Sequence, residues 1–354
     1  MLPNSLIDIH AHALHRDFLN HSTPQATLGV EPRGQGFGFK GYGDLDPLLF
    51  DIEGRVASLE TREIRLQVVS PPPRAVSDAS WAADPLFARR LNQQTAAVVR
   101  EAGRLLAGLA VPSLSDPTQA VDTIRRAMDE DGLIGVALPT SAAGRPLDDG
   151  AFESLFAECA RRGCPVFMHP TSGVDRSALG SYTMLQVIGW PTETALCVAR
   201  LIFAGVWERH PGLHLILAHG GGALPSLIGR LDLAYNAPKY ERNLACHAHI
   251  TRPPTDYLQH ILFDTAIAHP TLLRHLIDLA GPDNVVFGTD FPFEVGDPLG
   301  AIALPVLDTL YPATQAKIKG GTLAALMGLP SPLPLREGPG EGAAVPAFTG
   351  KSTP

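Results

Sequence analysis

The chain has 354 residues, which is long enough for one large α/β domain or two ordinary ones. Its hydrophobic content of 45% and charged content of 18% are typical of a well-packed enzyme. The formal net charge of −8 argues against nucleic acid and anionic membranes as partners, and no uncharged apolar run is long enough to span a bilayer.

Eight short apolar runs alternate with amphipathic stretches along the chain. Near-continuous apolar strands are typical of a parallel sheet that helices cover on both faces. Eight such strands alternating with helices predict an α/β fold of the (β/α)8 TIM barrel type. An open doubly wound sheet is the alternative, but no GxGxxG motif directly follows the first run. In chain order the expected strands are residues 6–9, 65–70, 105–111, 134–138, 166–168, 213–218, 261–264 and 284–288.

The first expected strand leads directly into two histidines one residue apart, His10 and His12. Side chains of an extended strand alternate with a period of two, so both imidazoles point to the same side. At the C-terminal end of a barrel strand that side faces the barrel axis. Two neutral imidazoles in this position can bind one divalent ion.

Two segments fall outside the alternating pattern. Residues 13–50 form a long, glycine-rich insertion after the first strand, at the end of the barrel where active sites lie. We expect a lid or substrate-binding loop there, with an unstructured surface loop as the alternative. Residues 331–354 are rich in proline and glycine, so we expect a C-terminal tail after a barrel domain that spans residues 1–330.

Three further residues of the types that bind metals stand at the ends of later strands. His169, His219 and Asp290 each follow an apolar run directly, which places them at the same rim as His10 and His12. His219 opens an HGGG sequence, and there it is either a fifth ligand or a general base acting on an activated water. Together these residues predict a metal-assisted active site.

Other polar residues near the rim are weaker candidates. Asp264 ends the seventh expected strand, where it either orients a metal ligand or lines the pocket. His249 and His269 lie in loops that could reach the pocket. The fourth and fifth expected strands contain no lysine, so a carboxylated lysine bridging two metals is not expected, and we predict one divalent ion per chain.

Four sequence segments, DIHAH, VFMHP, LAHGGGALPSLIGRLD and VVFGTDFPF, resemble the amidohydrolase superfamily, in the branch of aminocarboxymuconate-semialdehyde decarboxylase. The resemblance runs from about residue 6 to residue 329. It implies a homodimer and a single divalent ion, usually zinc or manganese. It implies His219 as the catalytic base, and the ligands His10, His12, His169 and Asp290, of which Asp290 would also carry a proton.

The resemblance also concerns two substrate-binding arginines. Arg230 matches the position from which the decarboxylase sends an arginine into the neighbouring active site to hold a substrate carboxylate, and a guanidinium fork suits a planar carboxylate. A second arginine of the decarboxylase would fall near Gly43, where this chain has none. The nearest cations are Lys40 and Arg33, so the substrate is expected to differ from that of the decarboxylase itself.

The leading prediction is a metal-dependent decarboxylase that acts on an unsaturated or aromatic carboxylic acid. A hydrolase of an ester, lactone, amide or carbon–carbon bond, or a hydratase, would use the same ligands. A non-catalytic metal-binding scaffold is disfavoured because all five metal-site positions are filled. The N-terminus shows no secretory signal, and the four cysteines form no CxxC pair, so we expect a cytoplasmic protein.

Overall fold

The computed structural model describes residues 6–16, 30–34, 36–39, 44–76, 86–114, 116–142, 144–171, 177, 179–237 and 245–329. Lys40, much of the 13–50 insertion and the whole of the expected 331–354 tail lie outside these residues. The lid and the tail therefore remain predictions.

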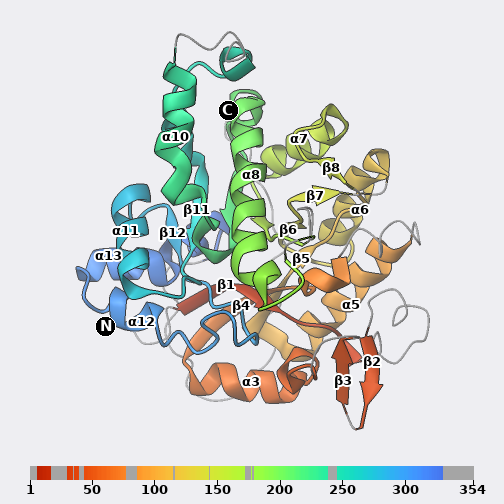
Figure 1. Ribbon diagram of the computed structural model, residues 1–354. Helices are drawn as coiled ribbons and strands as arrows, with labels where there is room; N and C mark the ends of the chain where they lie inside the picture. The colour runs from red at the N-terminus through yellow and green to blue at the C-terminus, as the bar shows by residue number, and fades with distance from the viewer. Residues whose placement is uncertain are drawn as a thin grey trace.

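Eight parallel strands form one sheet, and each coincides with one of the eight apolar runs of the sequence. The first and last strands come together, because the Ile9 N–H donates to the Phe287 carbonyl (3.0 Å) and Ala11 forms a parallel bridge with Phe291. The predicted TIM barrel is confirmed (Figure 1). In sheet order the strands are β1 (Leu6–His12), β4 (Ile64–Ser70), β5 (Leu106–Ala110), β6 (Gly135–Leu138), β9 (Pro165–Met168), β10 (His214–Leu217), β11 (Ile261–Asp264) and β12 (Val285–Val286).

The helices lie around the outside of this barrel (Figure 1). In α6, Pro117 takes the first position, and the Asp116 carboxylate caps the helix by accepting the Thr118 N–H (3.0 Å). None of the described helices has both the length and the apolar character that crossing a membrane requires. The helices are α3 (Ile52–Thr61), α5 (Phe87–Ala102), α6 (Pro117–Asp129), α7 (Glu153–Arg162), α8 (Trp190–Phe203), α9 (Val206–Arg209), α10 (Leu224–Asn236), α11 (Pro270–Ala280), α12 (Ala303–Leu307), α13 (Pro312–Ala316) and α14 (Thr322–Leu326).

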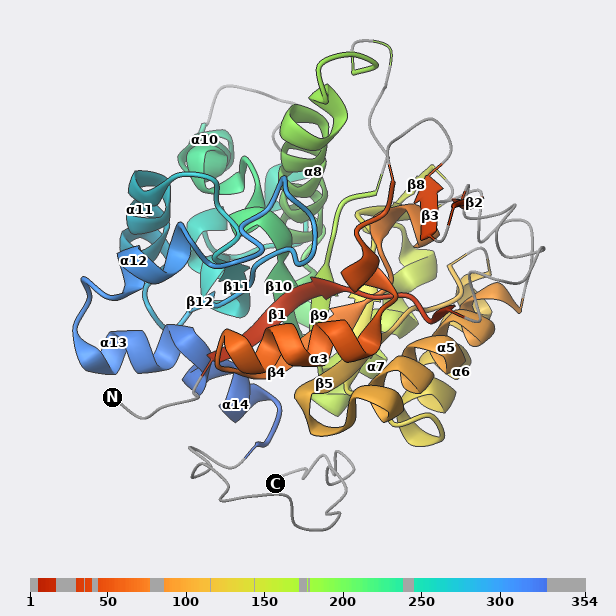
Figure 2. The same cartoon turned by 90° about the horizontal axis from the view of Figure 1, so that it is seen from below.

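Apolar side chains fill the interior of the barrel, as expected for a packed core rather than a pore. Leu323 and Ala324 of α14 join this interior cluster, and α14 lies against β1 at one end of the barrel (Figure 2). The strands contribute Ile7, Ile9, Leu66, Val68, Ala107, Leu109, Phe167, Ile216 and Val286.

Strand β1 contains a bulge that turns its end toward the barrel axis. Asp8 pairs with Gln67 of β4 but Ala11 pairs with Val69, so three steps along β1 match only two steps along β4. Ile9 belongs to the interior cluster, and the next residue, His10, also faces inward against Phe167, with ring centroids 4.9 Å apart. The bulge breaks the strict alternation between Ile9 and His10.

The described part of the insertion contains an antiparallel hairpin of β2 (Val30–Arg33) and β3 (Gly36–Phe39), which projects from the barrel in Figure 1. Phe37 anchors β3 by packing edge-on against Phe50, with a centroid distance of 5.1 Å. A second short hairpin, β7 (Ser141–Ala142) and β8 (Arg145–Pro146), follows β6.

Candidate metal centre and active site

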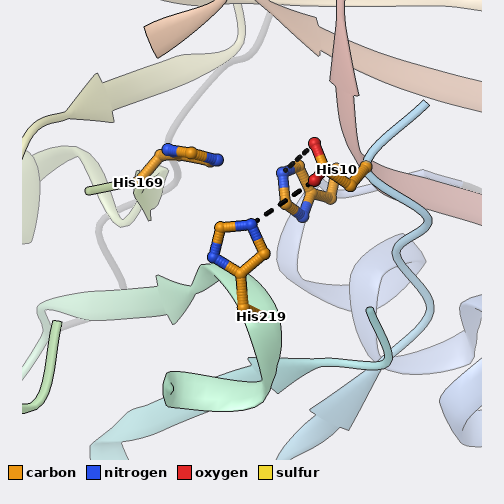
Figure 3. Close-up of side chains that lie close together, drawn as sticks. His10, His169 and His219 are labelled. Atoms are coloured by element: carbon orange, nitrogen blue, oxygen red, sulfur yellow. Dashed lines mark ion pairs between the residues drawn. The ribbon is translucent and has the colours of Figure 1, made fainter. Parts of the chain in front are cut away.

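The structure brings all five predicted metal-site residues together at the C-terminal ends of the strands. His10, His169, His219 and Asp290 each offer one ligand atom, and these four atoms lie within 4.8 Å of one another. Figure 3 shows the three imidazoles reaching from separate elements toward a common point. His12 adjoins the same group, with its Nε2 3.3 Å from His10 Nε2 and 3.2 Å from Asp290 Oδ1.

The donor atoms suit a divalent cation. Asp290 Oδ1 is buried and lies 3.2 Å from the Nε2 atoms of both His10 and His12, as expected of an atom placed to share a cation with them. Burial lowers the pKa of both His12 and His169, so these imidazoles are neutral at pH 7, the form that binds metal. Nitrogen and carboxylate donors in such a cluster are typical of a transition-metal site.

Asp264 bonds to the ring nitrogen of His10 that faces away from the centre. Its Oδ2 lies 2.6 Å from His10 Nδ1, an arrangement that leaves Nε2 directed at the centre. Burial alone would lower the pKa of His10, but the carboxylates of Asp290 and Asp264 outweigh it and raise that pKa to about 10. Binding of a cation therefore has to displace a proton from His10.

The second oxygen of Asp264 accepts hydrogen bonds from two backbone N–H groups. Asp264 Oδ1 accepts the N–H of Gly220 (2.7 Å) and that of Ala266 (3.1 Å), and the side chain is fully buried. The sequence left open whether Asp264 lines a pocket or orients a ligand. The structure shows Asp264 bonded to His10 Nδ1, which favours the role of orienting a ligand.

His219 and Asp290 both have left-handed backbone conformations, with φ of 56° and 61°. Such conformations are strained for residues with a side chain and cluster at functional sites. Burial would raise the pKa of Asp290, but the adjacent His10 outweighs it and holds this pKa well below its usual range. Asp290 is therefore an anion, and its Oδ2 lies 3.4 Å from His219 Nε2.

The turn that carries His219, η6 (Ala218–Gly221), packs tightly on the start of α8. Gly222 has φ of +60°, and a Cβ at this position would lie 2.4 Å from the carbonyl oxygen of Pro191. The Ala223 N–H donates to that same carbonyl (3.0 Å). Only glycine fits this contact, which fixes the His219 turn against the residue that follows Trp190.

Sequence reasoning missed two aromatic residues beside the centre. The Trp190 ring lies nearly parallel to His219 (centroids 6.3 Å apart, 15° between planes) and edge-on to His169 (5.5 Å). Phe293 lies 5.4 Å from the His12 ring. Trp190 begins a WPTET segment at the start of a helix, at the rim of the barrel, and that location could have identified it.

Of the remaining candidates, Arg230, His249 and His269 are not part of the donor cluster. Arg230 is exposed on α10 and forms no ion pair with any described residue. Asp232, two residues further along the same helix, accepts the Thr255 N–H (2.9 Å). His269 caps α11 by accepting the Thr271 N–H (3.2 Å), and the exposed His249 packs against Gly205 at the end of α8, so neither lines the site. Lys40 lies outside the described residues.

Comparison with known proteins supports the same assignment. A family model described as amidohydrolase matches residues 7–329. The chain belongs to the amidohydrolase family. The 2-amino-3-carboxymuconate-6-semialdehyde decarboxylase of Dictyostelium discoideum is 28% identical to this amidohydrolase over 341 residues, 91% of each chain. The 6-methylsalicylic acid decarboxylase of Penicillium expansum is 34% identical over 232 residues, 64% of this amidohydrolase and 69% of that protein. The branch predicted from the sequence is confirmed.

Solved structures agree with the fold of this amidohydrolase. An apo structure named IDCase from Metarhizium anisopliae superimposes with a TM-score of 0.73 at 22% identity, covering 92% of this chain and 97% of that one. A dihydroxybenzoic acid decarboxylase from Polaromonas sp. JS666, solved with bound manganese, gives a TM-score of 0.73 at 21% identity over 92% and 97% of the two chains. Both likenesses show the shared barrel.

Proposed function

We propose that this amidohydrolase is a metal-dependent decarboxylase acting on an aromatic or unsaturated carboxylic acid. The observation that carries the proposal is the cluster of four imidazoles and one carboxylate at the C-terminal ends of the strands. Curated relatives over most of the chain are decarboxylases of such acids, including 6-methylsalicylic acid and γ-resorcylate. The site is suited to this class of substrate because Trp190 and Phe293 offer flat apolar surfaces beside the centre.

The proposed cofactor is one divalent ion held by His10, His12, His169 and Asp290. Zinc is favoured because imidazole-rich donor sets suit it, and manganese is the second candidate. When bound, the ion supplies Lewis-acid polarisation of the substrate or of water.

Protein side chains are proposed to carry the proton that the reaction requires. Decarboxylation breaks the bond between the carboxylate carbon and the ring or chain carbon that carries it. The bonding electrons stay on the ring or chain carbon as CO2 leaves, and this carbon must then receive a proton. His219 is the proposed base and proton carrier, with its Nε2 directed at Asp290 Oδ2. Asp290 is proposed both as a ligand and as a proton carrier. The position of His219 within the donor cluster also permits a role as fifth ligand.

The working unit is proposed to be a homodimer in the cytoplasm. Figure 1 shows α8 and α10 side by side. These helices and the residues just before α8 expose large apolar side chains. These are Tyr182, Val187, Ile188, Leu196, Leu227 and Leu233. Arg230 lies on the same helix as the last two. A second copy covering this surface would bury it and bring Arg230 of the partner subunit toward a substrate carboxylate.

A direct assay separates this proposal from a hydrolase on the same site. Enzyme loaded with zinc or manganese is incubated with 2-hydroxybenzoates, a muconate-type acid and an aryl ester, and CO2 and acid release are measured. The proposal predicts CO2 release that depends on the metal and is lost in His169→Ala. Acid release from the ester without CO2 from any carboxylate would establish the hydrolase instead.

A further inference from the structure

In a regular strand His10 and His12 would face the side opposite to Ile7 and Ile9, and the bulge between Asp8 and Ala11 lets Ile9 and the histidines face inward together. The bulge leaves one residue of β1 unpaired with β4, and a bulge needs local bonds to replace the interrupted ladder. The pairing partner Gln67 marks where the bulge begins, opposite Asp8. What fixes the backbone here also fixes the direction of His10 and His12.

Asp8 supplies the replacement bonds. Its Oδ1 accepts the N–H of His10 (3.1 Å), a bond across two residues that stabilises a local turn. The same oxygen accepts the N–H of Thr289 (3.1 Å), and Oδ2 accepts the Thr289 hydroxyl (2.7 Å). Thr289 directly precedes Asp290, so one carboxylate binds the backbone beside two of the proposed ligands.

A buried polar chain supports Asp8 from the outer helix α3. The Gln67 side-chain amide donates to Asp8 Oδ2 (2.8 Å) and accepts from Arg55 Nη1 (2.6 Å). Arg55 Nη2 also donates to the His12 carbonyl (2.5 Å). Asp8, Gln67 and Arg55 are all fully buried, and the Arg55 guanidinium lies over the Phe291 ring at 4.8 Å.

We infer that Asp8, supported by Gln67 and Arg55, is a positioning residue that holds the ligand-bearing segments of β1 and the turn after β12 in register. The Asp8 side chain accepts hydrogen bonds from the backbone of His10 and Thr289. At the other end of the hydrogen-bonded series, Arg55 donates to the backbone carbonyl of His12. Neither Asp8 nor its two supporting side chains, Gln67 and Arg55, are among the donors of the centre. The inference rests on the proposed metal centre but not on the proposed reaction.

Each hydrogen bond in this series runs in one direction, from Arg55 to Gln67 and from Gln67 to Asp8, which makes Asp8→Asn an informative substitution. An asparagine preserves the volume, and its oxygen can still accept from His10 and Thr289. Its NH2 group, however, would face the donor Nε2 of Gln67. Turning the Gln67 amide would relieve that contact but would set its NH2 group against Arg55 Nη1. Either arrangement leaves two buried donors facing each other.

The test compares metal binding by wild-type protein and three single variants, each prepared metal-free. Asp8→Asn removes an acceptor, and Thr289→Val removes one donor to Asp8 at nearly unchanged volume. Glu158→Gln is the matched control, because Glu158 is a buried carboxylate bonded by Arg125, Arg161 and Arg162, away from the centre. Zinc affinity is measured by competition with a chromophoric chelator, the visible spectrum is recorded with Co2+, and Tm is measured for each apo-protein.

The inference predicts that Asp8→Asn weakens zinc binding about 10–100-fold and alters the Co2+ spectrum, as expected when a partner of a ligand is lost. Thr289→Val should weaken zinc binding by a smaller factor than Asp8→Asn does. Glu158→Gln should lower Tm and leave both metal readouts unchanged. Zinc affinity in Asp8→Asn within twofold of wild type, with an unchanged Co2+ spectrum, would overturn the inference.

If Asp8→Asn does not fold, Thr289→Val decides by the same readouts, and wild-type affinity in that variant overturns the inference. Wild-type protein that binds no divalent ion would overturn the metal centre and the inference together. Absence of decarboxylation by zinc-loaded wild type would count against the reaction alone, since these affinities are measured without substrate.

Discussion

Replacing Gly222 with alanine tests how the turn that carries His219 is held. The residue has φ of +60°, and the added Cβ would lie 2.4 Å from the Pro191 carbonyl oxygen. With ψ of −125°, this backbone conformation is open essentially only to glycine and costs another residue about 1–3 kcal/mol, and overpacking costs about 1–3 kcal/mol more. We therefore expect Gly222→Ala to lower the free energy of unfolding by about 2–6 kcal/mol.

The same substitution should impair turnover. To restore ordinary contact the Pro191 carbonyl must retreat by about 1 Å, and Trp190, which stacks on His219, precedes it directly. A displacement of that size costs about 100-fold in rate when it reaches the reacting groups.

Urea denaturation of the apo-protein and steady-state kinetics of the metal-loaded enzyme measure the two effects. Gly150→Ala is the control, because its Cβ would meet no atom within 4 Å and its φ is not positive. An unfolding free energy and a turnover number that both match those of Gly150→Ala would refute the argument.

Three further predictions concern the centre and the assembly. Elemental analysis should find about one divalent ion per chain, because the described residues form one set of donors, and two tightly bound ions would contradict a mononuclear centre. If His219 is the base, His219→Asn should keep most of the metal while kcat falls by about 10²–10⁴-fold. Loss of metal as complete as in His169→Ala would make His219 a ligand. Mixing inactive Arg230→Ala with inactive His219→Ala chains should restore up to about a quarter of wild-type activity if Arg230 serves the partner's site, because random pairing leaves one intact site in half of the dimers. No recovery would assign Arg230 to its own chain.

The barrel and the metal-site residues were predictable because local patterns determine them. An apolar run that ends in a histidine or aspartate needs only its own sequence to place that side chain at the end of a strand. His10, His169, His219 and Asp290 all follow this rule, and the structure brings them together.

Features that depend on a distant partner were not predictable in this way. The bulge in β1 is defined only by its register with β4. Whether Asp264 orients a ligand or lines the pocket depends on where His10 lies relative to it. The stacking of Trp190 on His219 requires the packing of α8 against the HGGG turn. Each of these arises from contacts between segments far apart in the chain.

The bonds of Asp264 have a consequence for the motions of this enzyme. One carboxylate binds His10 on β1 through one oxygen and the Gly220 amide in the HGGG turn through the other. An ion that orders His10 must therefore also restrict the turn that carries His219. The hydrogen-exchange rate of the Gly220 amide should slow on metal loading, so that a single backbone proton, which touches neither metal nor substrate, reports whether the catalytic turn is locked in place.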